Sequence, residues 1–236
     1  MNNFDISATY YKIIGKNNGK YPYKLGLNTL ADSGEIFNKK PICGPGGLYF
    51  CNIKYIFEYL YYGNKVCILT IPDDAQVVKV GNKYKADQIY INGMLEINYD
   101  TIKYLVTCGA DITINNNYAV CWAARNGHQE IVKYLAKHGA DITADDNYAI
   151  RYASENDHLE TVKYLAEHGA DVTAKNNYAI CCAAQNGHLE TVKYLVEHGA
   201  DVTAINNYSI RHAASNGHLE TVKYLVKYLV EHGAVL

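Results

Sequence analysis

Arginine is scarce in this sequence, and its scarcity limits what the protein can bind. Only three of the 236 residues are arginine, at positions 125, 151 and 211, and none lies in the first half of the chain. Arginine supplies the planar, forked donor that suits phosphates and base edges, so we expect no nucleic-acid partner. The sequence also lacks any run of the ~20 apolar residues that a membrane-spanning helix requires, so we expect no membrane partner.

Proline and histidine are each missing from one part of the chain. All four prolines lie before position 73, and all nine histidines lie after position 127. These distributions indicate two units that meet near residues 92–98. In the first unit the absence of histidine removes the usual base for a Ser or Cys nucleophile and a common metal ligand. We therefore expect no enzyme, no metal and no cofactor.

The N-terminal residues, Met-Asn-Asn-Phe-Asp, lack the basic and then apolar pattern of a secretion signal. The seven cysteines are odd in number and show no framework spacing, which favours buried thiols in a reducing compartment. Residues 1–96 carry a formal charge of +3 and residues 97–236 carry −5. We expect an intracellular, non-secreted protein whose oligomeric state is not indicated by the sequence.

From position 98 onward the sequence repeats with a period of 30 residues. The full repeats are 117–146, 147–176, 177–206 and 207–236, and residues 98–116 supply only a second helix. In the third repeat the apolar residues Leu189, Val192, Leu195 and Val196 form one helical stripe. A single repeat cannot bury such a stripe, so the pattern predicts stacked helix pairs, of which at least ~3 are needed for stability.

Two local signals predict where helices end. Asn-Gly at 186–187 ends the first helix of its repeat, and Asp157 replaces this glycine one repeat earlier, as a residue that tolerates left-handed φ/ψ.

In the last repeat the segment 222–230 duplicates four residues. Because four residues add about one helical turn, we expect a longer final helix.

The segment at 187–204, GHLETVKYLVEHGADVTA, resembles the second helix and exit turn of an ankyrin repeat. This resemblance covers residues 98–236 and implies an α-solenoid that binds proteins through a concave face. The ankyrin unit is normally ~33 residues long, and its Thr-Pro-Leu-His start is replaced here by Tyr-Ala-Ile-Cys at 178–181. We therefore expect each finger to be shortened to a tight turn. We also expect the repeated tyrosines 118, 148, 178 and 208 to contribute more to packing between repeats.

The first unit, residues 1–96, is predicted to be an α+β domain. Strands are expected at 9–14, 48–51, 66–71 and 88–91, and a helix at 53–62. Segments such as CGPGGLYF at 43–50 resemble a domain that precedes ankyrin arrays in giant amoeba-infecting DNA viruses of the Mimivirus type. The resemblance implies a viral protein that acts in the host cytoplasm, and it transfers no activity to this domain.

An enzymatic alternative concerns the first unit alone. Its order of strands and helix faintly resembles that of ADP-ribosyltransferases, and in that interpretation Glu96 is the catalytic carboxylate. The lack of arginine and the position of Glu96 beside the repeats argue against it. Gly-Pro-Gly-Gly at 44–47 could also form a phosphate-binding loop, but it precedes a strand instead of a helix, which favours a structural turn.

Positions that vary between the repeats while their surroundings stay constant are candidates for partner contact. Three columns vary: 121/151/181/211, 122/152/182/212 and 125/155/185/215. In the ankyrin family the second and third columns face the groove, and Trp, Tyr and Arg are frequent in binding hot spots. The predicted partner-binding residues are Trp122, Arg125, Arg151, Tyr152, Glu155, Gln185, Arg211, His212 and Ser215.

Overall fold

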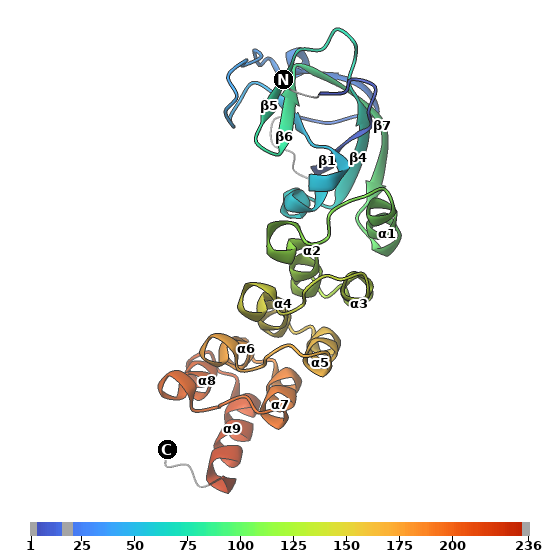
Figure 1. Cartoon of the computed structure of the whole chain (residues 1–236). Helices are drawn as coiled ribbons and strands as arrows, with labels where there is room; N and C mark the ends of the chain where they lie inside the picture. The colour runs from blue at the N-terminus through green and yellow to red at the C-terminus, as the bar shows by residue number, and fades with distance from the viewer. Residues whose placement is uncertain (1–3, 16–20, 233–236) are drawn as a thin grey trace. The chain divides into compact units, whose positions relative to one another are not determined.

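The computed structural model describes residues 4–15 and 21–232, which form two compact units, Met1–Ile114 and Asn115–Leu236. The first unit is rich in strands and the second consists of helices (Figure 1). This is the two-part architecture that the sequence predicts. Helix α1 (Tyr99–Thr107) belongs to the first unit by its contacts. Thr101 Oγ1 donates to the carbonyl of Glu96 at 2.6 Å, and the N–H of Asp111 donates to the carbonyl of Lys54 at 3.2 Å.

The first unit contains two antiparallel sheets. One has the strand order β1-β4-β7-β2 and the other β3-β6-β5. A single bridge between Tyr11 and Cys51 joins β1 to the end of β3. The elements are β1 (Tyr10–Ile14), β2 (Gly26–Thr29), the 3₁₀-helix η1 (Leu30–Ser33), β3 (Leu48–Phe50), the 3₁₀-helix η2 (Ile53–Tyr62), β4 (Lys65–Thr70), β5 (Val77–Val80), β6 (Lys83–Ala86) and β7 (Gln88–Glu96).

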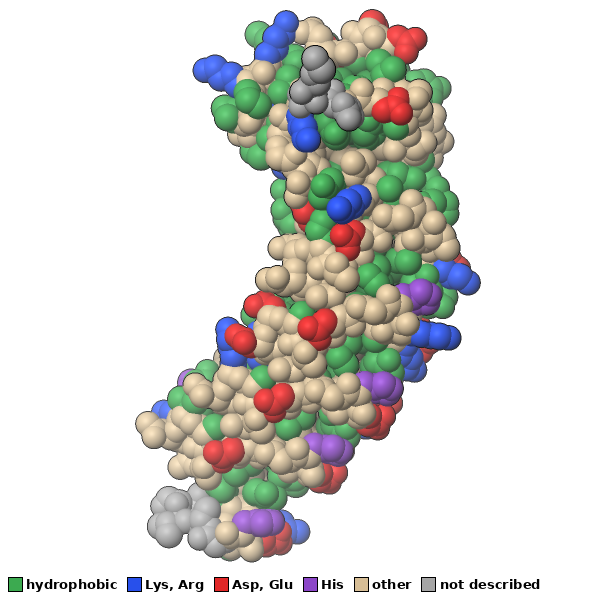
Figure 2. Space-filling view, in the orientation of Figure 1, with side chains coloured by type: hydrophobic (Ala, Val, Ile, Leu, Met, Phe, Trp, Pro, Cys, Tyr) green, Lys and Arg blue, Asp and Glu red, His purple; other side chains and the backbone are tan. Residues whose placement is uncertain are grey.

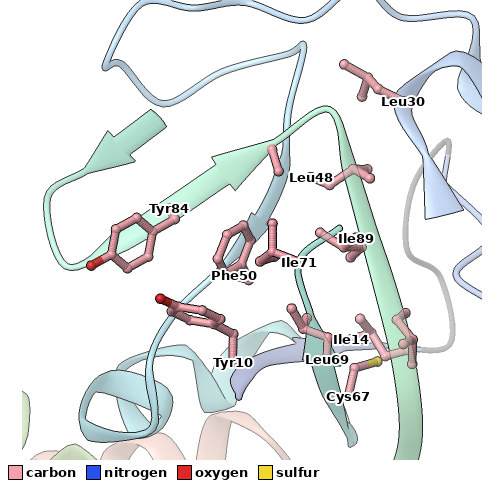
Figure 3. Packing of buried hydrophobic residues seen from close by; sticks show 12 residues of the cluster. Tyr10, Ile14, Leu30, Leu48, Phe50, Cys67, Leu69, Ile71, Tyr84 and Ile89 are labelled. Carbon is pink, nitrogen blue, oxygen red and sulfur yellow. The ribbon is translucent and has the colours of Figure 1, made fainter. Parts of the chain in front are cut away.

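The core of this unit is apolar and aromatic, and residues from both sheets contribute to it (Figure 3). Tyr10 from β1 meets the ring of Phe50 edge to face, with centroids 5.1 Å apart, and the ring of Tyr84 from β6 at 5.7 Å. Leu69 and Ile89 complete the cluster from the larger sheet. Such offset and edge-to-face aromatic pairs stabilise a core beyond the area they bury.

The four strands and the helix predicted for the first unit are confirmed, with η2 adopting 3₁₀ instead of α geometry. Strands β2, β5 and β6 were not predicted. The loop at 44–47 forms a turn into β3. A Cβ placed on Gly46 would meet the backbone oxygen of Ile36, and one on Gly47 would meet the side chain of Lys85 at 2.7 Å. These glycines therefore serve close packing.

The second unit stacks its helices in two rows (Figure 1). The first helices of the repeats form one row, and the second helices form the other. The first row comprises α2 (Ile114–Arg125), α4 (Ala144–Glu155), α6 (Ala174–Gln185) and α8 (Ala204–Ser215), and the second comprises α3 (Gln129–Lys137), α5 (Leu159–Glu167), α7 (Leu189–Glu197) and α9 (Leu219–Glu231). The predicted stripe of the third repeat, Leu189 excepted, is buried in this stack.

Each first helix begins with a turn of three left-handed residues. In α4 these are Asp145, Asp146 and Asn147, with φ of 52°, 53° and 61°, and right-handed helix starts at Tyr148. Asparagine and aspartate tolerate this conformation better than other side-chain-bearing residues. The shortened finger that the sequence predicts is therefore a one-turn left-handed segment.

In the first three repeats the asparagine that ends the left-handed turn bonds to the segment that leads into the next turn. Asn147 Oδ1 accepts the backbone N–H of Asp171 at 2.8 Å. The equivalent bonds from Asn117 to Asp141 and from Asn177 to Asp201 measure 2.9 and 2.7 Å. These side chains hold successive turns in register. They give the asparagine of the first three repeats a structural role at this position.

Helix ends and the last helix follow the predictions. Gly187 and Asp157 have φ of 77° and 59° in the turns that follow α6 and α4. Helix α9 has 13 residues where α3, α5 and α7 have nine, so the duplicated segment lengthens it. Residues 233–236 of the fourth repeat lie outside the described part of the chain.

Candidate protein-binding surface

A row of tyrosines connects the first helices of the second and third repeats. The rings of Tyr148 and Tyr152 stack within α4 with centroids 3.9 Å apart, and Tyr152 meets Tyr178 of α6 at 5.9 Å. All three rings are half-buried. Tyr148 and Tyr178 belong to the repeated tyrosines that the sequence predicts to pack between repeats. The structure shows that both contact Tyr152, which belongs to the second variable column.

Arg125 extends this aromatic row toward the first repeat. Its side chain is exposed, its Nη1 donates to the hydroxyl of Tyr148 at 3.4 Å, and its guanidinium lies 5.3 Å from the ring centre of Tyr152. The bond to Arg125 lowers the pKa of Tyr148, whereas burial raises it more, so the net shift is upward. The guanidinium is thus held in place by aromatic contacts while part of it stays accessible to solvent.

Trp122 lies on α2, which also carries Arg125, and Glu155 lies on α4, which also carries Tyr152. Trp122 is half-buried, with its ring 5.2 Å from that of His128. The Oε2 atom of Glu155 is buried and has no hydrogen-bond partner among the described residues. The carbonyl of Glu155 accepts a bond from His188 Nε2 at 3.0 Å, which ties the third repeat to the second.

Arg151 is not part of this accessible surface, which corrects its prediction as a partner contact. It is 5 % exposed, and its Nε and Nη2 donate to the carbonyls of Asp146 and Asp145, each at 2.9 Å. Arg211 makes the equivalent bonds in the fourth repeat, to Asn206 at 2.8 Å and Ile205 at 3.3 Å, although it is exposed. Both arginines satisfy carbonyls that the left-handed turn leaves without helical partners.

The remaining predicted residues lie between the third and fourth repeats. Gln185 Oε1 accepts the hydroxyl of Tyr208 at 2.7 Å, and the ring of Tyr208 stacks on His212 with centroids 3.8 Å apart. Ser215 is exposed, and its hydroxyl donates to the carbonyl of His212 at 3.1 Å. The structure therefore brings Arg125 and Arg151 to Tyr152, and Gln185, His212 and Ser215 together around Tyr208, whereas the ring of Trp122 contacts His128.

The second row of helices presents a different, regular surface. Figure 2 shows histidines along the edge where α3, α5, α7 and α9 lie. In each of these helices a histidine Nδ1 contacts the carbonyl four residues earlier at 2.7–2.8 Å and stacks on that tyrosine ring. These residues complete helix ends and do not vary between the repeats.

The carboxylate considered for the enzymatic alternative has structural partners. Glu96 ends β7, pairs with Lys65 Nζ at 3.1 Å and accepts a bond from Asn64 at 3.3 Å. It does not line the cavity of this unit that Tyr11, Tyr49 and Tyr59 help to form. Within residues 4–15 and 21–232 no three His, Cys, Asp or Glu side chains are arranged to hold a metal ion. Over the same residues, every helix is too short or too polar to cross a bilayer.

Comparisons with known proteins match the repeat region. The family model for ankyrin repeats in three copies matches residues 94–176, and that for ankyrin repeats in many copies matches residues 180–226. An uncharacterised protein of Acanthamoeba polyphaga mimivirus is 39 % identical over 118 residues, which cover 47 % of this chain and 83 % of that protein.

Two further proteins of the same virus carry names as ankyrin repeat proteins. One is 36 % identical over 134 residues, covering 52 % of this chain and 21 % of the relative. The other is 38 % identical over 137 residues, covering 55 % and 41 %. This chain therefore spans less than half the length of both. Its paired helices, its 30-residue period and these matches show that the chain belongs to the ankyrin-repeat family.

Proposed function

We propose that the repeat unit binds a protein partner through the first helices of its repeats, on the concave face that ankyrin stacks use. The observation that carries this proposal is the row formed by Tyr148, Tyr152 and Tyr178 with Arg125. Tyrosine, tryptophan and arginine dominate the energetics of protein interfaces. Here their side chains already contact one another, so little rotational freedom is lost when a partner covers them.

The chemistry of this surface favours a partner with both polar and apolar groups. The tyrosine rings and Trp122 offer apolar area, whereas the exposed guanidinium of Arg125 offers hydrogen-bond donors to a carboxylate or a carbonyl. Carboxylates of the left-handed turns, such as Asp145 and Asp146, lie exposed on α4 and would suit basic groups. In view of the viral relatives, we propose that this partner is a protein of the infected host cell.

The test is capture of a partner by the immobilised full chain from amoebal lysate, compared with a Trp122→Ala/Tyr152→Ala double variant. We expect the double variant to lose at least about tenfold in retained partner, because each ring is a hot-spot type worth ~2 kcal/mol. A matched control is Tyr134→Ala/Tyr164→Ala, which removes rings from the second row. If the first pair keeps full capture, or both pairs lose it equally, the assignment to the first helices is wrong.

A further inference from the structure

The first unit contains a cavity that plays no part in the proposed protein-binding surface. Its volume is about 340 Å³, at the lower end of the ~300–1,000 Å³ of ordinary small-molecule pockets. The cavity is lined by residues of β1, of β3 and its flanking segments, of η2 and of β6, and the bridged pair Tyr11 and Cys51 is among them. It is therefore built entirely from elements of one unit.

Aromatic residues make up five of the eleven residues that line the cavity. Tyr11 and Phe50 are buried, with the ring of Phe50 packed against Tyr10 and Tyr84 in the core, whereas Tyr49 and Tyr59 are half-buried and Tyr62 is 53 % exposed. The hydroxyl of Tyr49 is already engaged with the Gly44 backbone, accepting its N–H at 2.9 Å and donating to its carbonyl at 2.8 Å. The rings therefore present faces and edges to a ligand, which suits a flat aromatic group.

Two ammonium groups lie in this aromatic wall. Lys12 Nζ donates to the carbonyl of Tyr49 at 2.8 Å and lies 4.5 Å from the ring centre of Tyr23. Lys83 Nζ lies 4.7 and 5.7 Å from the ring centres of Tyr49 and Tyr59. Among the described residues, neither lysine has a carboxylate within ion-pair distance, and Lys83 has no hydrogen-bond acceptor. A lysine ammonium has three donors, so both retain donors for an anion.

The electrostatic setting favours a negative ligand over a positive one. Burial, with a smaller effect from the nearby charge of Lys83, lowers the pKa of Lys12 to about 8, so uncompensated positive charge is costly here. Two acids lie near the cavity but outside its lining residues: Glu58 accepts a bond from Asn82 at 2.9 Å, and Glu35 accepts the N–H of Gly46 at 2.9 Å. Burial, and to a smaller extent the charge of Glu58, raises the pKa of Tyr59. The lining residues themselves thus include two lysines and no carboxylate.

We propose that this cavity binds a small aromatic anion of the mononucleotide type, with its ring among the tyrosines and its phosphate at Lys83 and Lys12. Lysine is a common phosphate ligand as a point charge, and it needs no arginine fork, which this unit lacks. The cavity has no set of paired side chains aimed at a base edge. The different bases should therefore bind with similar affinity.

Calorimetric titration of the full chain with AMP tests this proposal, with adenosine and inorganic phosphate as partial ligands. We expect saturable binding of AMP and at least about tenfold weaker binding of both partial ligands, because each reaches only one part of the wall. GMP, CMP and UMP should bind within about tenfold of AMP. If AMP does not bind, or binds no more tightly than either partial ligand, the proposal is overturned.

Substitutions of single residues test whether AMP binds in this cavity. Lys83→Gln should weaken AMP binding by about tenfold or more, whereas Lys79→Gln, on the exposed side of the neighbouring strand β5, should change it less than twofold. Tyr62→Ala removes an exposed rim ring and should also weaken AMP, which keeps the test valid if Lys83→Gln fails to fold. Unchanged affinity in a folded Lys83→Gln or Tyr62→Ala variant would place AMP elsewhere and refute the assignment.

Discussion

Ile205 is the residue of the repeat unit whose side chain and backbone conformation agree least. It occupies the first left-handed position of the fourth repeat with φ of 53° and ψ of 51°. The equivalent residues in the first two repeats are Asn115 and Asp145, which tolerate this conformation. A left-handed residue with a Cβ costs roughly 1–2 kcal/mol, and β-branching restricts its side chain further. Replacement by asparagine should relieve this strain.

The side chain of Ile205 also buries some apolar surface, and this opposes the gain. It is 50 % exposed, and full burial of an isoleucine is worth ~1.5–3 kcal/mol, so its partial burial contributes about 1 kcal/mol. Ile205→Asn alone therefore mixes two effects of similar size. Ile205→Ala loses the same apolar contact but keeps the left-handed cost. We expect the asparagine variant to be about 1 kcal/mol more stable than the alanine variant.

Ile210 provides a matched control because it is half-buried in the right-handed part of the same element, α8. There alanine should be more stable than asparagine by about 0.5 kcal/mol, since helix propensity favours it. The order of the two variants is thus opposite at the two sites. Urea unfolding followed by circular dichroism measures all four. If alanine equals or exceeds asparagine at position 205, the left-handed strain is not real.

Three further predictions concern the turns and the thiols. Asn177→Ala should cost about 1 kcal/mol more in urea unfolding than Asn176→Ala, because both lose left-handed tolerance but, among the described residues, only the side chain of Asn177 bonds to a following segment. Equal costs would contradict that bond. Asp157→Ala should be about 1 kcal/mol less stable than Asp157→Gly, since glycine accepts the φ of 59°; the reverse order would exclude strain there. Maleimide labelling with mass spectrometry should modify Cys43 and Cys108 quickly, and rapid labelling of a buried thiol in the native protein would refute its placement. The thiols expected to react only after unfolding are Cys51, Cys67, Cys121 and Cys181.

The architecture of the second unit could be predicted because its signals are local and repeated. The 30-residue period, the Asn-Gly at 186–187 and the four-residue duplication each fix a helix start, end or length. Three consecutive left-handed residues are different, because no local preference selects them as a set. The bond from Asn147 to Asp171 joins residues near the two ends of one repeat, so it becomes visible only in the folded structure.

The first unit was predicted less completely for a related reason. Strand β6 carries Lys85, which is fully buried beside Gly47 and donates to the carbonyl of Ile42 at 3.3 Å. A buried lysine breaks the alternation by which strands are recognised, so β6 gave no clear pattern. The cavity at Lys83 was missed too. Its walls come from four parts of the chain that share no spacing or motif.

The variable columns predict a partner-binding surface but not the role of each residue in it, and one pair of variants tests the two roles. Arg151 is buried against Asp145 and Asp146, so Arg151→Ala should lower the free energy of unfolding by about 2–3 kcal/mol. Arg125 is exposed and makes one 3.4 Å bond, so Arg125→Ala should cost less than about 1 kcal/mol.

Partner capture should show the opposite order. Once corrected for the folded fraction, capture should stay unchanged in Arg151→Ala and fall in Arg125→Ala, because only Arg125 has a guanidinium that a partner can reach. Variation between repeats reports on partner contact where the side chain is accessible. At the first column, where Arg151 and Arg211 replace Cys121 and Cys181, it reports on how each left-handed turn satisfies its carbonyls. A loss of capture in folded Arg151→Ala would show that this column contacts the partner after all.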